Sequence, residues 1–153
     1  MNKKEYKSIS FKSGNERAEF YDDRLNFHVY VMTIWLSKQI KEKYNKDIWI
    51  IVTEVFRTRE EQRRIYGENT EDVSPHEWWN AVDISVRNLI HVGIDPDELV
   101  ELVNKHWIYG HGKYKCAIRH DVGKGDHIHL QAFPGTTKFV GKKLHRRKKE
   151  ESI

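Results

Sequence analysis

The stretch Ser74-Pro75-His76-Glu77-Trp78-Trp79-Asn80-Ala81-Val82-Asp83 constrains the rest of the fold, because it places a histidine and a carboxylate seven positions apart. In a helix, residues at this spacing lie about 10 Å apart along the axis, too far for two side chains that each bind one ion at about 2 Å. In an unbroken strand, an odd offset puts them on opposite faces. The stretch therefore predicts a loop carrying His76 that turns into a strand carrying Asp83, and Pro75 favours this non-helical start.

A second cluster, Asp126-His127-Ile128-His129-Leu130-Gln131, lies far downstream. Zinc in proteins is bound by imidazole and carboxylate groups as well as by thiolates. The two segments can therefore form a zinc site if the fold brings them together. His127 and His129 are two apart on a predicted strand and share one face, which leaves open whether one or both bind the metal.

At these residues the sequence resembles the M15 family of zinc peptidases. That family includes D-Ala-D-Ala carboxypeptidases and dipeptidases, and phage endolysins that cut L-alanyl-D-glutamate bonds. Its patterns are G-[YF]-R-[ST]-x-x-E-Q, then S-x-H-x-x-G-x-A-x-D, then (D/E)-x-x-H followed by an apolar residue. They are matched in this order by Phe56-Arg57-Thr58-Arg59-Glu60-Glu61-Gln62, by Ser74, His76, Ala81 and Asp83, and by Asp126, His129 and Leu130. Two pattern glycines are replaced, by Val55 and Trp79, and both replacements alter the pocket wall.

The resemblance implies a role for each matched polar residue. Zinc (Zn2+) would be held by three ligands, with a fourth position open to water: His76, Asp83 and His129. Asp126 would be the general base, Arg57 would hold a substrate carboxylate or carbonyl oxygen during catalysis, and Ser74 would add a hydrogen bond to the substrate. The family pattern favours His129 alone as the second histidine ligand, with His127 near the pocket or outside it.

The expected elements predict an α+β fold. Apolar residues that recur every three or four positions favour a helix from about Asp23 to Tyr44, and Thr58 and Asp95 are each expected to begin a further helix. Strands are expected at 48–53, 81–86, 114–119 and 127–132. The last two strands form a predicted hairpin. The resemblance implies the same class: a small antiparallel sheet with helices packed on it, as in the hedgehog/DD-peptidase fold.

The length of 153 residues suffices for one domain with a core. We expect a single metallopeptidase domain over residues 1–137, with a loosely ordered extension at 1–15, followed by a basic C-terminal tail over 138–153. The net charge of +4 favours an anionic partner. The tail is either a solvated charge run or a tether to anionic polymers of a bacterial wall.

The N-terminal residues are charged and lack an apolar segment, so no secretory signal is expected. No apolar run is long enough to predict a membrane span. We expect synthesis in the cytoplasm. The protein would then either be released to act on the cell wall, as phage endolysins are, or remain in the cytoplasm and act on dipeptides. The single cysteine, Cys116, excludes an internal disulfide and is expected to be a small buried side chain.

These features favour a zinc-dependent peptidase that hydrolyses peptidoglycan stem peptides with metal-activated water. It would be of the D,D-carboxypeptidase or the L-alanyl-D-glutamate endopeptidase type. One alternative is a non-catalytic zinc-binding domain of the same fold, as in hedgehog signalling domains. Another is a basic nucleic-acid-binding protein, which only the charge favours. Since no recognition motif of that kind is present, nucleic acid is not the expected partner.

Overall fold

A five-stranded sheet is the centre of the computed structural model, which describes residues 3, 6–45, 48–121 and 125–141. The strand order is β1-β2-β3-β6-β5, with bounds Ile9–Phe11, Ile50–Glu54, Ala81–Ser85, His127–Gln131 and Ala117–His120. Three neighbouring pairs are antiparallel, and β1 runs parallel to β2. The fold is therefore α+β, as expected, but with a mixed sheet.

The parallel pair at the edge corrects two expectations. Residues 9–11 were expected in a loosely ordered extension, yet Ile9 is buried and pairs with Ile50. Parallel strands need a long crossover connection. Here the helices α1 (Gly14–Phe20) and α2 (Phe27–Tyr44) supply it, so the purely antiparallel sheet is wrong at this edge.

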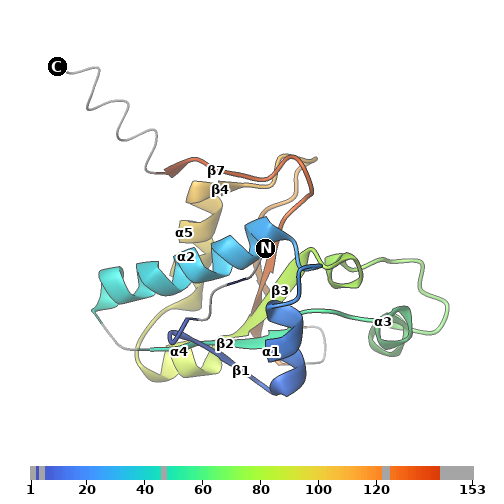
Figure 1. Ribbon diagram of the computed structural model, residues 1–153, viewed down its shortest axis with the longest axis horizontal. Coiled ribbons are helices and arrows are strands. Elements are labelled where there is room, and N and C mark those ends of the chain that lie inside the picture. Colours follow the sequence, from blue (N-terminus) through green and yellow to red (C-terminus); the bar gives the residue numbers. More distant parts are fainter. Residues whose placement is uncertain (1–2, 4–5, 46–47, 122–124, 142–153) are drawn as a thin grey trace.

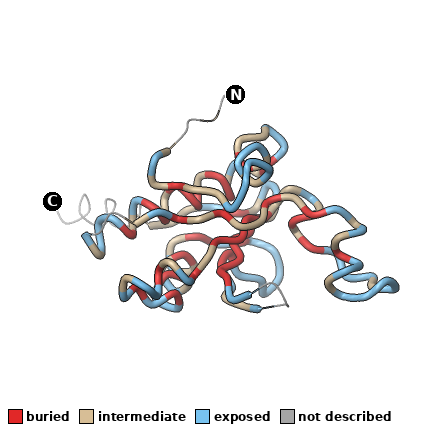
Figure 2. The backbone as a smooth tube through the Cα atoms, turned by 90° about the horizontal axis from the view of Figure 1, so that it is seen from below, coloured by how far each residue is buried: buried red, intermediate tan, exposed pale blue. Residues whose placement is uncertain are grey.

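The helices α2 and α5 (Pro96–His106) lie together against the sheet, where they cover one of its faces (Figure 1). Alternate residues of the central strands point into this layer, and the fully buried ones include Val82, Ile84, Ile128 and Leu130. Figure 2 shows the buried stretches running through the middle of the molecule, with exposed stretches at the loops and helix ends. The opposite sheet face carries Asp83 and His129, which lie directly opposite each other on β3 and β6.

Caps predicted from the sequence fix several helix starts. Thr58 and Glu61 form a capping box at α3 (Arg59–Tyr66), and Asp95 accepts a hydrogen bond from the Asp97 N–H at α5. The long helix begins later than expected, because the Asn26 side chain accepts from the His28 N–H and caps α2 there. The short helix α1 was not predicted.

A second, two-stranded sheet joins β4 (Trp107–Ile108) to β7 (Lys138–Phe139). The Phe139 ring packs on Trp35 and Trp107, and the Val140 N–H donates to the His106 carbonyl at 2.9 Å. Packed chain thus continues past residue 137. The rest of the predicted tail, 142–153, lies outside the described residues. Within the described part of the chain, no helix combines the length and apolar character that a bilayer crossing requires.

Candidate metal centre

The sheet register aligns polar residues from neighbouring strands. Asp83 on β3 is directly opposite His129 on β6, and Glu54 at the end of β2 is opposite Asp83 on the other side. Directly opposed residues on one sheet face have Cβ atoms about 4.5–5.5 Å apart. The row Glu54–Asp83–His129 therefore gathers two carboxylates and an imidazole.

His76 reaches the same place from a 3₁₀ turn, η1 (Pro75–Trp78), immediately before β3. Ser74 caps this turn, since its hydroxyl accepts from the His76 N–H at 3.2 Å, and Glu77 accepts in return from the Ser74 N–H. The predicted loop-to-strand stretch is thereby confirmed. Ser74 positions His76, and its predicted substrate contact stays a prediction.

The turn ends at Trp79 in the left-handed region, with φ of 60°. This is the position where the family pattern has glycine, and the backbone here adopts a conformation that glycine takes without strain. Trp79 stacks on Phe56 with ring centroids 4.6 Å apart, and the Arg24 guanidinium carbon lies over the Trp79 ring, 4.4 Å from its centroid. The stack stabilises a backbone that the indole side chain would otherwise disfavour.

Three ligand atoms converge behind this turn. One atom each from His76, Asp83 and His129 all lie within 4.8 Å of one another, and the residues are 1%, 3% and 7% exposed. Asp83 Oδ1 is 3.0 Å from His76 Nε2 and also 3.0 Å from His129 Nδ1. The fold thus brings together the three predicted metal ligands.

Hydrogen bonds on the far side of each ring fix which nitrogen carries the proton. His76 Nδ1 faces the Val55 carbonyl oxygen at 2.8 Å, so Nδ1 must donate. His129 Nε2 faces Gln131 Oε1 at 2.9 Å, and the Gln131 amide nitrogen donates to the Lys115 carbonyl, which fixes the amide orientation. In the neutral rings, the remaining nitrogens point lone pairs at Asp83 Oδ1.

Three acceptors directed at one another require a cation or added protons between them. Burial disfavours charge on His76, but the Asp83 carboxylate outweighs burial and raises the pKa of that imidazole. Burial likewise works against ionised Asp83, yet the two imidazoles hold its pKa well below the usual range. Two imidazoles and a carboxylate are a donor set that fits zinc, and their outer hydrogen bonds orient the rings as metal sites require.

His127 lies beside this group without belonging to it. Its Nε2 is 3.4 Å from Asp83 Oδ2, the other oxygen of that carboxylate, and its Nδ1 faces the Gly125 carbonyl at 2.9 Å. The three-residue metal group contains His129 and leaves out His127. The choice of His129 over His127 as the metal ligand stays a prediction.

Asp126 is held on the outside of the site. Its two carboxylate oxygens accept from Arg119 Nε and Nη2, at 3.1 and 2.7 Å, and its side chain is 41% exposed. The Arg119 hydrogen bonds hold the pKa of Asp126 below its usual value. Among the described residues, no hydrogen bond or ion pair joins Asp126 to the three metal-group residues, so its role as general base stays a prediction.

Arg57 is almost completely buried, with 3% of its surface exposed. Its Nε donates to Glu54 Oε1 at 2.7 Å, Nη2 donates to the same oxygen, and Nη1 donates to Gln62 Oε1 at 2.7 Å. Three of its five N–H donors are therefore engaged within the chain. Its contact with substrate stays a prediction.

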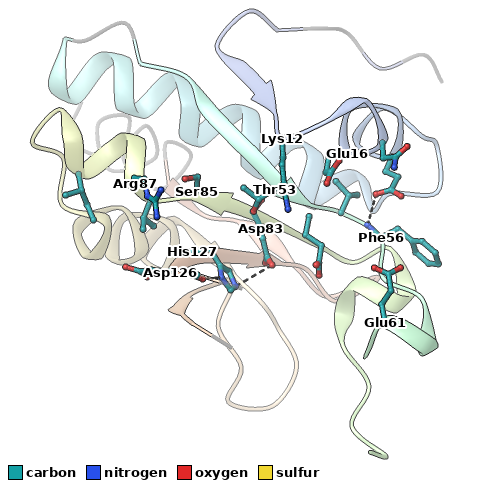
Figure 3. Close-up of a pocket in the computed structure, with 17 residues that line it drawn as sticks. Lys12, Glu16, Thr53, Phe56, Glu61, Asp83, Ser85, Arg87, Asp126 and His127 are labelled. Atoms are coloured by element: carbon teal, nitrogen blue, oxygen red, sulfur yellow. Dashed lines mark hydrogen bonds and ion pairs between the residues drawn. The ribbon is translucent and has the colours of Figure 1, made fainter. Parts of the chain in front are cut away.

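Two cavities meet at the candidate metal centre. The larger, about 820 Å³, and the smaller, about 350 Å³, both have Asp83 and His127 in their walls. His76 and His129 line the smaller cavity, whereas Asp126 lines the larger one. Figure 3 shows Asp83 and His127 directed toward each other, with Lys12 and Arg87 on other walls of the larger cavity. The two cavities therefore adjoin at Asp83 and His127.

Two residues of this centre were not predicted. Gln131 orients the His129 ring, and its position two residues further along the same strand face was a usable signal. Glu54 comes within 3.7 Å of His76 Nε2, but nothing local in the sequence indicates this.

Compared with known proteins, the chain matches no protein-family profile, no curated protein and no solved structure. The likeness to M15 peptidases therefore rests on the three sequence motifs alone.

Proposed function

We propose that the chain is a zinc-dependent peptidase of the M15 type that hydrolyses peptide bonds in peptidoglycan stem peptides. The observation that carries this proposal is the convergence of His76 Nε2, His129 Nδ1 and Asp83 Oδ1 at the junction of two cavities. The three ordered motifs support the same family. A sheet with α2 and α5 on one face and the site on the other is compatible with the hedgehog/DD-peptidase fold.

Bound zinc would polarise a carbonyl group and lower the pKa of water in its open position. The chain prepares for this by fixing the two imidazoles through Val55 and Gln131, so that little rearrangement accompanies binding. Burial of Asp83 strengthens its attraction for a cation, because the local dielectric is low.

Two groups compete for the proton-transfer role. Asp126, assigned by the resemblance, lines the larger cavity together with Asp83, but its hydrogen bonds to Arg119 lower its pKa and make it a weaker base. His127 lies closer to the metal group, with Nε2 3.4 Å from Asp83 Oδ2. We assign the base to Asp126 and treat His127 as the group that a failed Asp126→Asn test would implicate.

The second candidate is a non-catalytic zinc-binding domain of the same fold. One observation favours it: the two groups predicted to act on the substrate are both engaged by other side chains, Arg57 by Glu54 and Asp126 by Arg119. Such a protein would bind zinc and wall fragments without cleaving them.

The test is mass spectrometry of purified peptidoglycan fragments after incubation with zinc-loaded protein. New fragments that differ by one hydrolysed peptide bond support the peptidase. Their mass also identifies whether a D-Ala-D-Ala or an L-alanyl-D-glutamate bond is cut. Intact fragments, together with one tightly bound zinc per chain, would favour the binding domain.

Two matched variants connect any cleavage to the centre. His129→Ala removes a ligand, so zinc content and cleavage should be lost together. His127→Ala removes a neighbouring imidazole, and the protein should retain one zinc per chain by elemental analysis. The reverse pattern of metal retention would show that His127 is the ligand.

A further inference from the structure

Glu54 reaches the candidate metal centre through an irregularity in the sheet. From Val52 to Glu54, strand β2 advances two residues, while its partner β3 advances only one, from Ile84 to Asp83. In a regular strand, Glu54 would share a face with Val52, which is buried in the core with its partner Ile84. The irregularity instead sets Glu54 opposite Asp83. A β-bulge beside a site commonly redirects one side chain in this way.

The redirected carboxylate lies close to a metal-group nitrogen. Glu54 Oε1 is 3.7 Å from His76 Nε2, the atom that also faces Asp83. The Glu54 side chain is only 11% exposed, and it lines the larger cavity next to Asp83. A second carboxylate therefore lies at the edge of the group of three.

Arg57 holds Glu54 in this position. Two of its nitrogens, Nε and Nη2, donate to the same Glu54 oxygen, and Gln62 anchors the remaining arm of the guanidinium. Gln62, 2% exposed, is itself fixed through a hydrogen bond to the Asp72 carbonyl. The carboxylate therefore has a buried support that limits its movement.

A buried ion pair is poor evidence for stability, because removing two charges from water offsets most of their attraction. The pair has a clearer purpose as part of a cation site. A divalent ion bound by Asp83 and two neutral imidazoles would retain one positive charge. The Glu54 carboxylate would cancel the charge of the Arg57 guanidinium, which without Glu54 would repel the ion.

We propose that Glu54 is a fourth protein group of the metal centre, directed toward the ion by the β-bulge and by Arg57. Arg57 is then a positioning residue that acts through Glu54. This proposal uses only the metal-binding half of the proposed function and can be tested whether or not a peptide is cleaved.

The test measures zinc affinity by competition with a chromophoric chelator. Glu54→Gln keeps the size of the side chain and removes its charge, and we expect zinc to bind about 10- to 100-fold more weakly, as when a supporting group of a metal site is removed. Glu61→Gln is the matched control, because this carboxylate lines the same cavity but accepts from the Thr58 N–H and hydroxyl at the start of α3. The control should bind zinc like the wild type.

Cobalt(II) in place of zinc gives a readout that a general loss of stability would not produce. The visible absorption of the cobalt protein should change in Glu54→Gln and stay unchanged in Glu61→Gln. Arg57→Lys should also change the spectrum, but it should have no further effect in the Glu54→Gln background. That non-additivity would show that Arg57 acts through Glu54.

Wild-type zinc affinity and an unchanged cobalt spectrum in folded Glu54→Gln would overturn the proposal. A raised KM in Arg57→Lys with an unchanged cobalt spectrum would instead return Arg57 to substrate binding. Failure of the wild type to bind zinc at all would refute the metal centre itself. Zinc binding that depends on Glu54, without any peptide cleavage, would refute only the proposed peptidase activity and would leave the role of Glu54 intact.

Discussion

Asp83→Asn is the sharpest perturbation of the centre, because one oxygen of this carboxylate faces both His76 and His129 at 3.0 Å. The substitution preserves shape and removes the anionic ligand. Binding of zinc to structural sites amounts to about 10–16 kcal/mol, or about 3–5 kcal/mol for each of three or four ligands. We therefore expect zinc affinity to fall by two to three powers of ten, at about 1.4 kcal/mol per power.

The loss can be measured as a change in thermal stability. With free zinc buffered about 1,000-fold above the wild-type dissociation constant, binding stabilises the folded protein by about 4 kcal/mol. For the variant, the same zinc concentration should contribute less than about 2 kcal/mol, and about 0.4 kcal/mol if affinity falls a full 1,000-fold. In a chain of this size, each kcal/mol of added stability raises Tm by about 2–4 °C. Zinc should thus raise the wild-type Tm by roughly 8–16 °C and the variant Tm much less.

The metal-free protein provides a second, pH-dependent signature. The raised pKa of His76 means that its charged form stabilises the fold below about pH 6.5, and that this contribution is lost as pH rises through the folded-state pKa. The depressed pKa of Asp83 means that its contribution is present above about pH 4 and is lost below that value. Asp83→Asn should therefore destabilise the metal-free protein more at pH 5.5 than at pH 9.

Differential scanning calorimetry with and without buffered zinc, at both pH values, tests both parts. Asp23→Asn, at an exposed carboxylate between α1 and α2, is the control and should match the wild type. An equal zinc-induced rise in Tm for Asp83→Asn and wild type would refute the assignment of Asp83 as a ligand. An equal metal-free destabilisation at both pH values would refute the charged His76–Asp83 pair.

Three further predictions concern the surroundings of the centre. Arg119→Gln should let the pKa of Asp126 rise toward its usual value. If Asp126 is the general base, the acid limb of the pH profile of kcat/KM should then move to higher pH. An unchanged acid limb would indicate that another group is the base. Trp79→Ala and Trp79→Gly both remove the stack on Phe56, but only glycine adopts the positive φ without strain. In urea unfolding, the glycine variant should therefore be more stable than the alanine variant by about 1 kcal/mol. The opposite order would contradict backbone strain at this position. Burial raises the pKa of Cys116 to about 12, so a thiol reagent at pH 8 should react only after unfolding, and rapid labelling of native protein would contradict that burial.

Local chemistry in the sequence was enough to predict much of the scaffold. Capping by Thr58 and by Asp95 acts over a few residues, and the helices begin where these caps predict. The spacing between His76 and Asp83 excluded a regular helix or strand, and the structure has a 3₁₀ turn leading into a strand. The burial of Cys116 and the hairpin of β5 and β6 likewise follow from local patterns.

The partnerships at the centre depended on tertiary structure. Asp83 lies opposite His129 because of strand register, which joins residues 46 positions apart in the chain. The parallel edge strand depends on a crossover through two helices, and short-range periodicity carries no information about where that crossover returns. Neither pairing can be deduced from neighbouring residues.

The same limit applies to the charged side chains. The sequence shows Arg57 and Asp126 only as a cation and an anion that match the motifs of a family. Nothing in the sequence prevents either side chain from facing a substrate. In the fold, Arg57 is bonded to Glu54 and Asp126 to Arg119, because a bulge and a hairpin bring those partners within hydrogen-bond reach. The sequence determined which groups are available for chemistry near His76. Packing and strand register decided which of them face the candidate metal centre and which neutralise one another.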